Sequence, residues 1–443
     1  MMDRHPLLQD YIQDVGRQIK ARELRKEIMR EIAGHLDDLM DRGRQQGHDD
    51  DAAARFATAQ MGDAAAVAQG LNRVHKPRVP WGMLCCLALL AAIALIAMYA
   101  VHLGYGASTL KYRYEAELHF KHAIFIGAGL IAFFAISRLH YRKLIHFSWI
   151  VYIGTLVLAL STFIWGVQIN GTHAYLQLGS FVLDVSGVSS YLFIISAAGM
   201  LYLHKEKAGW QTAALHTAMF SAVPMLYYIA VPSFVNLLVY AAAYALLLYV
   251  SRAGWRWMAP HSLLSACLFG GYFLSRNGQR QLAGFLYPHE DPHGYGYMYV
   301  QIEEATRSAG WLGRGFGSVA QTLPEIHADT ILTYIVHSFG WLAGLLVAGV
   351  VLLFLLQLVQ AAGAVRDQYG KMLVAGIASL FSVQFIWSFG MSLGLLPISA
   401  LRLPFISFGG SWLLVQWAAA GLIYSVYRRK DMIRIVNGPT SIR

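Results

Sequence analysis

The sequence predicts an all-α polytopic membrane protein with ten transmembrane helices and a small helical N-terminal domain on the cytoplasmic side. Of the 443 residues, 56% are hydrophobic and 14% are charged, whereas soluble domains carry about 25% charged residues. The apolar residues also cluster into runs near the roughly 20 residues that cross a bilayer. Residues 1–80 are polar instead, so we expect no cleavable signal peptide and an internal first anchor.

The segment 1–80 has the pattern of a small helical bundle. Apolar residues recur at helical spacing between charged ones: Leu24, Ile28, Ile32 and Leu36. After a turn-like stretch, an acidic cluster precedes the Ala-rich run 52–60, as at a helix N-terminus, and 64–71 indicates a third short helix. Pro77 and Pro80 end this domain.

Ten apolar runs fill residues 81–430, and a tail of residues 431–443 follows. They are Trp81–Leu103, Phe120–Ser137, Leu144–Trp165, Val182–Leu203, Trp210–Ala230, Pro232–Val250, Trp257–Leu274, Thr330–Val359, Met372–Leu396 and Phe405–Tyr427. We interpret each run as one membrane span.

The basic residues set the orientation. They follow every second run, at Arg138, Arg142, Lys143, Lys205, Lys207, Arg252, Arg256, Arg366, Lys371, Arg428, Arg429, Lys430 and Arg434. The intervening loop 168–181 has no Lys or Arg, although the first outer loop holds Lys111 and Arg113. By the positive-inside rule, both termini are expected to be cytoplasmic in a bacterial plasma membrane.

The net charge of +10 does not indicate nucleic-acid binding, because the basic residues gather at span ends, where they meet anionic membrane lipids. Cys85, Cys86 and Cys267 all lie inside apolar runs. We therefore expect neither a structural disulfide nor a metal site.

The loop 275–329 is too long for a simple connection, and the predicted topology places it outside the cell. It ends in the segment 323–330, where Glu325 and Asp329 are four residues apart and would share one face of a helix. Asp329 lies at the expected boundary of water and bilayer, where a carboxylate can accept a proton from a sugar hydroxyl. The alternative is that Asp329 caps the following helix.

Other residues of this loop and of the C-terminal spans are candidates for binding. Arg280, Arg307 and Arg314 could bind a diphosphate by paired hydrogen bonds, or could simply face water or lipid headgroups. The glycines of 291–315 permit close approach of a ligand or form turns. Gly376–Ser411, rich in small residues, indicates a packing seam with a kink near the outer end of the tenth span.

The same segments resemble the FtsW/RodA/SpoVE (SEDS) family across residues 81–430. Leu323–Thr330 is similar to the family's LPE-x-H-T-D-F-I-F, and 376–411 to GIAS…Q…GM…GLLP…LPFISYGGSS. Residues 285–301 resemble FL-P…DP-x-G-x-GY…Q, and Asn170–Gly179 resembles NGA…LG. Residues 1–80 loosely resemble the prefix domain of some permeases and membrane sensors, which implies nothing about chemistry.

The resemblance implies a peptidoglycan glycosyltransferase that polymerises lipid II at the outer membrane face, partnered by a class B penicillin-binding protein and releasing undecaprenyl diphosphate. It makes Asp329 the catalytic residue. The residues expected to bind substrate are Glu325, His327, Arg280, Arg314, Gln301, Gln384 and Ser407. No cofactor is expected, apart from a divalent cation as an alternative to arginines for neutralising the diphosphate.

An aspartate with a pKa near 4 is a weak base at neutral pH. Burial would raise the pKa of Asp329 and a helix dipole would lower it, and the sequence leaves both open. It also leaves open whether the protein serves elongation, division or sporulation.

Four segments depart from the family pattern. PDLGT is Pro232–Asn236, QPSE is Asp184–Gly187 without a Glu, GEELG is Val336–Gly340, and the motif threonine is Ala328. A second hypothesis is a non-catalytic scaffold that recruits a penicillin-binding protein, and these losses favour it more than they favour transport. A lipid-precursor flippase is a third, but it requires paired ionisable groups within the spans, and the main candidates are only His216, His261 and His337.

Overall fold

The structure is a computed structural model that describes residues 5–20, 25–74, 78–106, 118–169, 172–179, 181–204, 209–320 and 322–431. Leu24, Pro77, Lys111, Arg113, Asn170, Gly171, Lys205, Lys207 and Arg434, which the sequence analysis used, lie outside these residues, as does the tail beyond 431. The chain divides into an N-terminal unit, residues 1–79 with 427–443, and a membrane unit, residues 80–426.

In its described residues the N-terminal unit contains four helices, one more than the sequence pattern indicated. They are α1 (Pro6–Gln18), α2 (Arg25–Gln45), α3 (Asp50–Met61) and α4 (Ala64–Val74). Asp49 caps α3, since its side chain accepts a hydrogen bond from the Ala52 N–H at 2.7 Å. The apolar faces of all four helices meet in one core that includes Leu8, Ile32 and Ala54.

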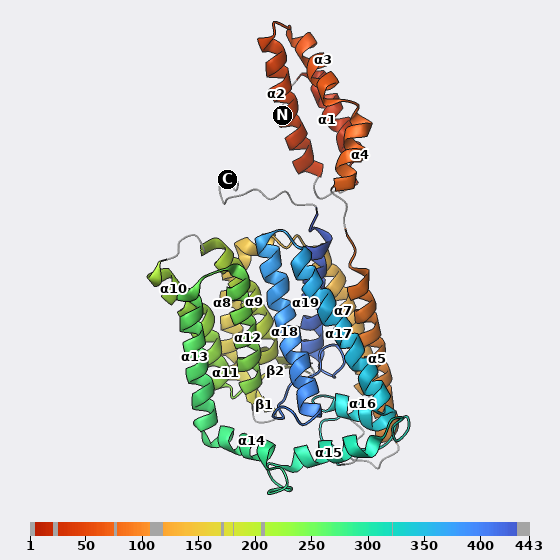
Figure 1. The fold of residues 1–443 in the computed structure, drawn as a ribbon, viewed down its shortest axis with the longest axis vertical. Coiled ribbons are helices and arrows are strands. Elements are labelled where there is room, and N and C mark those ends of the chain that lie inside the picture. Colours follow the sequence, from red (N-terminus) through yellow and green to blue (C-terminus); the bar gives the residue numbers. More distant parts are fainter. Residues whose placement is uncertain are drawn as a thin grey trace. The chain divides into compact units, whose positions relative to one another are not determined.

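Helices occupy all ten apolar runs of the membrane unit (Figure 1). They are α5 (Trp81–Gly106), α7 (Leu118–Arg138), α8 (Lys143–Trp165), α9 (Val185–His204), α10 (Trp210–Thr217) with η3 (Ala218–Ala222) and α11 (Val223–Ala230), α12 (Phe234–Ser251), α13 (Trp255–Leu274), α16 (Ile331–Phe339) with α17 (Trp341–Ala364), α18 (Gln368–Ser392) and α19 (Gly410–Arg428). Among the described residues, eight segments are long and apolar enough to cross a membrane, and α13 and α19 are not among them.

The eighth predicted span, Thr330–Val359, is not one helix, and the segment long and apolar enough to cross a membrane is α17. The predicted span divides into α16 and α17 at Gly340, whose φ of 85° favours glycine. A Cβ atom at Gly340 would also lie 2.2 Å from the carbonyl oxygen of Trp311. The helices therefore separate where the long outer loop packs against the chain.

The prediction of an all-α fold missed a small antiparallel sheet between α8 and α9. The strands β1 (Gly166–Ile169), β2 (Thr172–Leu178) and β3 (Phe181–Asp184) pair in the order β1-β2-β3. Tyr175 lies opposite Asp184 in the register of β2 and β3. The fourth predicted span consequently begins at Val185, and Asp184 lies at the junction of strand and helix.

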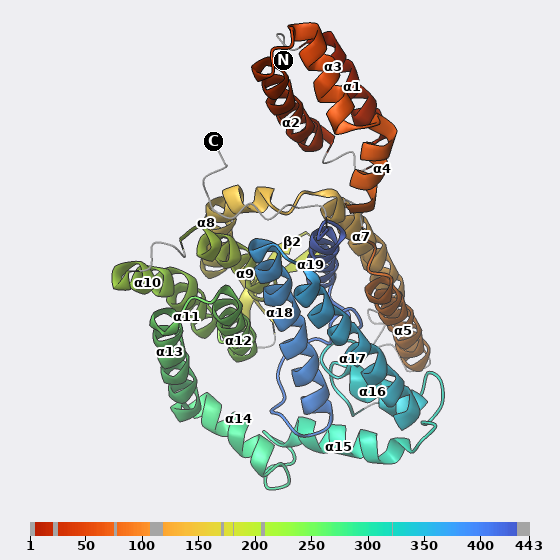
Figure 2. The same ribbon diagram turned by 45° about the horizontal axis from the view of Figure 1, so that its top comes forward.

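Two helices of the long loop, α14 (Arg276–Leu286) and α15 (Tyr297–Ala309), lie across one end of the bundle of long helices (Figures 1 and 2). Both helices are hydrogen-bonded to the connection between α18 and α19. The Gln281 amide donates to the carbonyl oxygen of Ile398 at 2.8 Å, and the Ile398 N–H donates to the Tyr299 hydroxyl at 2.9 Å. This attachment brings the long loop to the same end as the segment that precedes α16.

Candidate functional site

The segment 322–330, which we call the Asp329 loop, consists of turns and not of the helix that would place Glu325 and Asp329 on one face. The Ala328 N–H donates to the Glu325 carbonyl oxygen at 2.9 Å, and the Thr330 hydroxyl donates to the Pro324 carbonyl oxygen at 2.6 Å. Glu325 has a φ of 50°, a left-handed conformation that costs a non-glycine residue about 1 kcal/mol or more.

A second segment holds this loop in place. The Ser407 hydroxyl donates to the carbonyl oxygen of Ala328 at 2.7 Å, and the Phe408 N–H donates to that of His327 at 2.8 Å. Ser407 is buried, and its oxygen also accepts from the Leu403 N–H at 2.8 Å. The small-residue segment before α19 therefore holds the backbone carbonyl groups of His327 and Ala328, the two residues before Asp329.

The structure contradicts the capping alternative for Asp329. The cap position of α16 is Thr330, and no cap hydrogen bond from a side chain is found there among the described residues. Asp329 is half-buried, and burial raises the pKa of its carboxyl to about 7, although Arg402 opposes this rise; Glu325 and Asp184 reinforce it. The carboxyl can therefore exchange a proton near neutral pH, which is what a general base requires.

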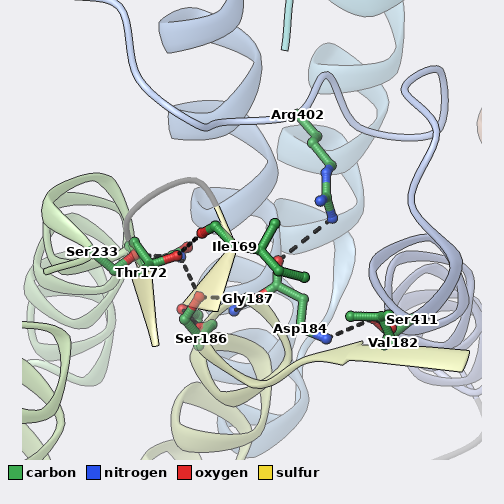
Figure 3. A network of polar contacts seen from close by, with 11 residues as sticks. Ile169, Thr172, Val182, Asp184, Ser186, Gly187, Ser233, Arg402 and Ser411 are labelled. Carbon is green, nitrogen blue, oxygen red and sulfur yellow. Dashed lines mark hydrogen bonds and ion pairs between the residues drawn. The ribbon is translucent and has the colours of Figure 1, made fainter. Parts of the chain in front are cut away.

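Arg402 and Asp184 are the charged residues beside Asp329 that the sequence analysis did not select. Arg402 lies in the connection between α18 and α19, and its Nη1 is 3.5 Å from Oδ2 of Asp184 (Figure 3). Oδ1 of Asp184 accepts hydrogen bonds from the Ser186 hydroxyl at 2.9 Å and the Gly187 N–H at 3.1 Å. No local pattern links positions 184 and 402, and only the fold brings them together.

Two of the departures from the family pattern meet at Asp184. Asn236 donates to the Ser186 hydroxyl at 3.0 Å and to the Ser233 hydroxyl at 2.9 Å. Ser186 in turn donates to Asp184 (Figure 3). The polar groups of Pro232–Asn236 therefore support the carboxylate at the start of α9.

Gly187 occupies the position of the Glu in the family's QPSE pattern. A Cβ atom at Gly187 would lie 1.7 Å from Cζ3 of Trp412, so any side chain there would collide with the indole ring. Trp412 itself stands where the LPFISYGGSS pattern ends in serine. A carboxylate is present nearby nonetheless, from Asp184, three residues earlier in the chain.

His327, Glu325 and Tyr175 complete the surroundings of Asp329. Nε2 of His327 is 3.7 Å from Oε2 of Glu325, and burial lowers the pKa of His327 despite this carboxylate. Tyr175, on β2, is buried, and burial raises its pKa to about 12, so its hydroxyl stays protonated at neutral pH. The charges of Asp184 and Asp329 also raise the pKa of Tyr175, and that of Arg402 lowers it.

The remaining residues that were predicted to bind substrate make contacts elsewhere in the structure. Gln384 is buried in α18 and accepts a hydrogen bond from the Tyr191 hydroxyl at 3.0 Å. Gln301 is in α15, where its buried Oε1 has no hydrogen-bond partner among the described residues. The Arg314 N–H donates to the His337 carbonyl oxygen at 2.9 Å, near the end of α16 farther from Asp329.

Arg280 lines a separate cavity of about 430 Å³ between α14, α15 and Ile398. Its guanidinium lies 5.3 Å from the ring centre of Tyr295, a cation–π distance. Arg307 forms an ion pair with Glu303 at 2.8 Å and is exposed. The arginine in electrostatic contact with Asp329 is thus Arg402, and the three loop arginines are placed elsewhere.

A bundle of apolar helices with a half-buried carboxyl, an arginine and a histidine gathered in its terminal loops defines a polytopic membrane protein with a polar site at one end of the bundle. Residues 80–432 match the profile of the FtsW/RodA/SpoVE family, described as cell cycle proteins. The chain belongs to this family, and residues 1–79 lie outside the match.

Curated relatives share about a quarter of their residues with the chain. A probable peptidoglycan glycosyltransferase FtsW of Geobacter metallireducens is 27% identical over 354 residues, which cover 77% of this chain and 94% of that protein. The stage V sporulation protein E of Bacillus subtilis is 26% identical, with coverage of 77% and 94%.

Solved structures support the fold. A chain from the structure of a peptidoglycan synthase complex is similar with a TM-score of 0.65 and 21% identity, covering 79% of this chain and 98% of that chain. The rod shape determining protein RodA of Thermus thermophilus has a TM-score of 0.58 and 20% identity, covering 79% and 97%. The expected multi-pass membrane fold and family are confirmed.

Proposed function

We propose that the chain is a peptidoglycan glycosyltransferase that polymerises lipid II, with Asp329 as its general base. The observation that carries this proposal is the half-buried carboxyl of Asp329, whose pKa burial raises to about 7, in a rigidly held loop that matches the family's catalytic motif. The relatives that cover most of the chain are peptidoglycan glycosyltransferases by name.

In this reaction Asp329 removes the proton from the acceptor 4-hydroxyl. The oxygen attacks the anomeric carbon of a second lipid-linked sugar and forms the glycosidic bond, while the bond from that carbon to the diphosphate breaks. Its electron pair leaves with undecaprenyl diphosphate. A well-placed base contributes roughly 10²–10⁴ in rate, and the hydrogen bonds from Ser407 and Phe408 supply the rigidity that keeps this base in place.

The Asp184 network supports an active enzyme over a non-catalytic scaffold. The polar positions lost from two family motifs are matched by a carboxylate that is hydrogen-bonded, paired with Arg402 and in electrostatic contact with Asp329. A site that served only for packing has no need of a charged pair, because burying charges is costly.

The same proposal includes ten spans, with α13 and α19 crossing the membrane beside the eight apolar segments, and both termini in the cytoplasm. The Asp329 loop then faces the outside, where lipid II is polymerised. The polymerase is partnered by a class B penicillin-binding protein, by analogy with the synthase complex whose chain shares this fold. The N-terminal unit is a separate cytoplasmic domain of about 80 residues.

The test compares purified full-length wild type with Asp329→Asn in polymerisation of lipid II, with and without a co-expressed penicillin-binding partner. Asn keeps the size but not the basicity, so we expect a loss on the order of 10² or more. Glu290→Gln, an exposed carboxylate of the same outer loop, is the matched control and should retain activity. Near-normal polymerisation by Asp329→Asn at equal melting temperature would rule out Asp329 as the base.

A further inference from the structure

Arg402 is a cation with more hydrogen-bonding capacity than its surroundings use. A guanidinium has five N–H donors, but the contact of Arg402 with Asp184, at 3.5 Å, is longer than a good hydrogen bond of an ion pair. Among the described residues no hydrogen bond to the Arg402 side chain is found, although only 23% of this side chain is exposed. These donors are open to water, and a ligand that replaces the water can accept hydrogen bonds from them.

The position of Arg402 is fixed on two sides. Asp184 faces it, and Asp184 is itself held by Ser186 and the Gly187 N–H. On the other side, a Cβ atom at Gly409 would lie 3.1 Å from Nη1 of Arg402, so the guanidinium rests against backbone that lacks a side chain. The arginine is thus oriented before any ligand arrives, which lowers the entropic cost of binding.

An anion that binds Arg402 must compete with the carboxylates around it. Asp184, Asp329 and Glu325 all act on Arg402 electrostatically, yet within the described part of the chain the one carboxylate paired with it at 4 Å or less is Asp184. A planar guanidinium with free N–H groups suits the paired oxygens of a phosphate. A single phosphate oxygen would compete poorly with Asp184, whereas a diphosphate offers several oxygens and more charge.

We infer that Arg402 binds the diphosphate of the lipid-linked donor, with Asp184 as the counter-ion that orients it. The inference rests on the proposed function, in which the Asp329 loop holds the reacting bond. Arg402 lies against Gly409, and the neighbouring Phe408 N–H donates to the His327 carbonyl oxygen in that loop. Arg402 stabilises the charge that develops on the diphosphate oxygen as its bond to the anomeric carbon breaks. Asp184 acts through Arg402 and is a positioning residue.

The experiment measures binding without turnover. Purified full-length wild type, Arg402→Gln and Arg402→Lys are titrated at pH 8 with undecaprenyl diphosphate, undecaprenyl phosphate and undecaprenol in detergent, and complexes are quantified by native mass spectrometry. We expect Arg402→Gln to weaken diphosphate binding about tenfold or more, with a smaller loss for the monophosphate and none for undecaprenol. Arg402→Lys keeps the charge but loses the fork, so its affinity should fall between the two.

Arg276→Gln is the matched control, because it removes the same charge from an exposed position on α14. Diphosphate affinity of Arg402→Gln within twofold of wild type would overturn the inference, as would an equal loss for undecaprenol, which carries no phosphate. If wild type polymerises lipid II but its diphosphate affinity is independent of Arg402, the inference fails and the proposed function stands. If Arg402-dependent binding occurs in a wild type that never polymerises, the reverse holds.

Discussion

The acid limb of the pH–rate profile should report the ionisation of Asp329. With a pKa of about 7, its carboxyl is about half ionised at pH 7, about one tenth at pH 6 and about nine tenths at pH 8. Because a base acts only when deprotonated, kcat/KM for lipid II should rise about tenfold from pH 6 to pH 8. An aspartate with the ordinary value of 3.8 would give no change over this range.

The neighbours of Asp329 should move this midpoint in opposite directions. Arg402 lowers the pKa of Asp329, so Arg402→Gln should raise the midpoint by about one pH unit. Asp184 raises the pKa of Asp329, so Asp184→Asn should lower the midpoint. The other titratable groups of the site are Glu325, His327 and Tyr175. The charge of Glu325 also raises the pKa of Asp329.

The assay is initial-rate polymerisation from pH 5.5 to pH 8.5 at constant ionic strength, with the midpoint fitted separately from the plateau. This separation matters because Arg402→Gln is also expected to lower the plateau through lost diphosphate binding. Glu290→Gln should leave the midpoint unchanged. A flat profile in wild type, or midpoints that move in the same direction in the two variants, would refute the electrostatic account of Asp329.

Three further changes test other parts of the structure. Ser407→Ala should lower the free energy of unfolding by about 1–3 kcal/mol, because it leaves the Ala328 carbonyl and the Leu403 N–H unpaired, and it should slow polymerisation. The control is Ser308→Ala, which loses only a contact within α15. Equal melting temperatures of the two variants would contradict the role of Ser407. In a background with Cys85, Cys86 and Cys267 replaced by Ala, an impermeant maleimide should label Glu290→Cys in intact cells but Asn437→Cys only after permeabilisation; the opposite pattern would invert the topology. Deletion of residues 1–75 should leave an inserted membrane unit, since the apolar core of α1–α4 closes on itself, and loss of the protein from membranes would argue against a separate domain.

The apolar runs were predictable because burial in a bilayer demands about 20 successive apolar residues, a condition visible in any window of the sequence. Their interruptions were harder. The break at Gly340 depends on the carbonyl of Trp311, which approaches from a distant loop, and one glycine between two apolar stretches does not reveal it. The π-helical turn of η3 and the missed helix α1 have similarly weak local patterns.

The site was predictable where its residues share a motif and not where they come together only in the fold. Asp329, Glu325 and His327 lie in one loop and were identified together, and Ser407 proved to hold that loop. Asp184 and Arg402 are isolated charges in different segments, and each alone looks like a solvated end of a span. The sheet that presents Asp184 is formed by strands of four to seven residues, too short for a clear alternation of polar and apolar positions.

The contact between Gly187 and Trp412 restricts the order in which this site can have changed over its history. The family patterns have Glu at 187 and Ser at 412. Tryptophan has no room at 412 while 187 carries a side chain, because even a Cβ atom at 187 would lie 1.7 Å from the indole ring. The change to glycine must therefore precede or accompany the change to tryptophan. Once Trp412 is present, a carboxylate can return at 187 only after Trp412 itself has been replaced, and until then the carboxylate of this site is that of Asp184.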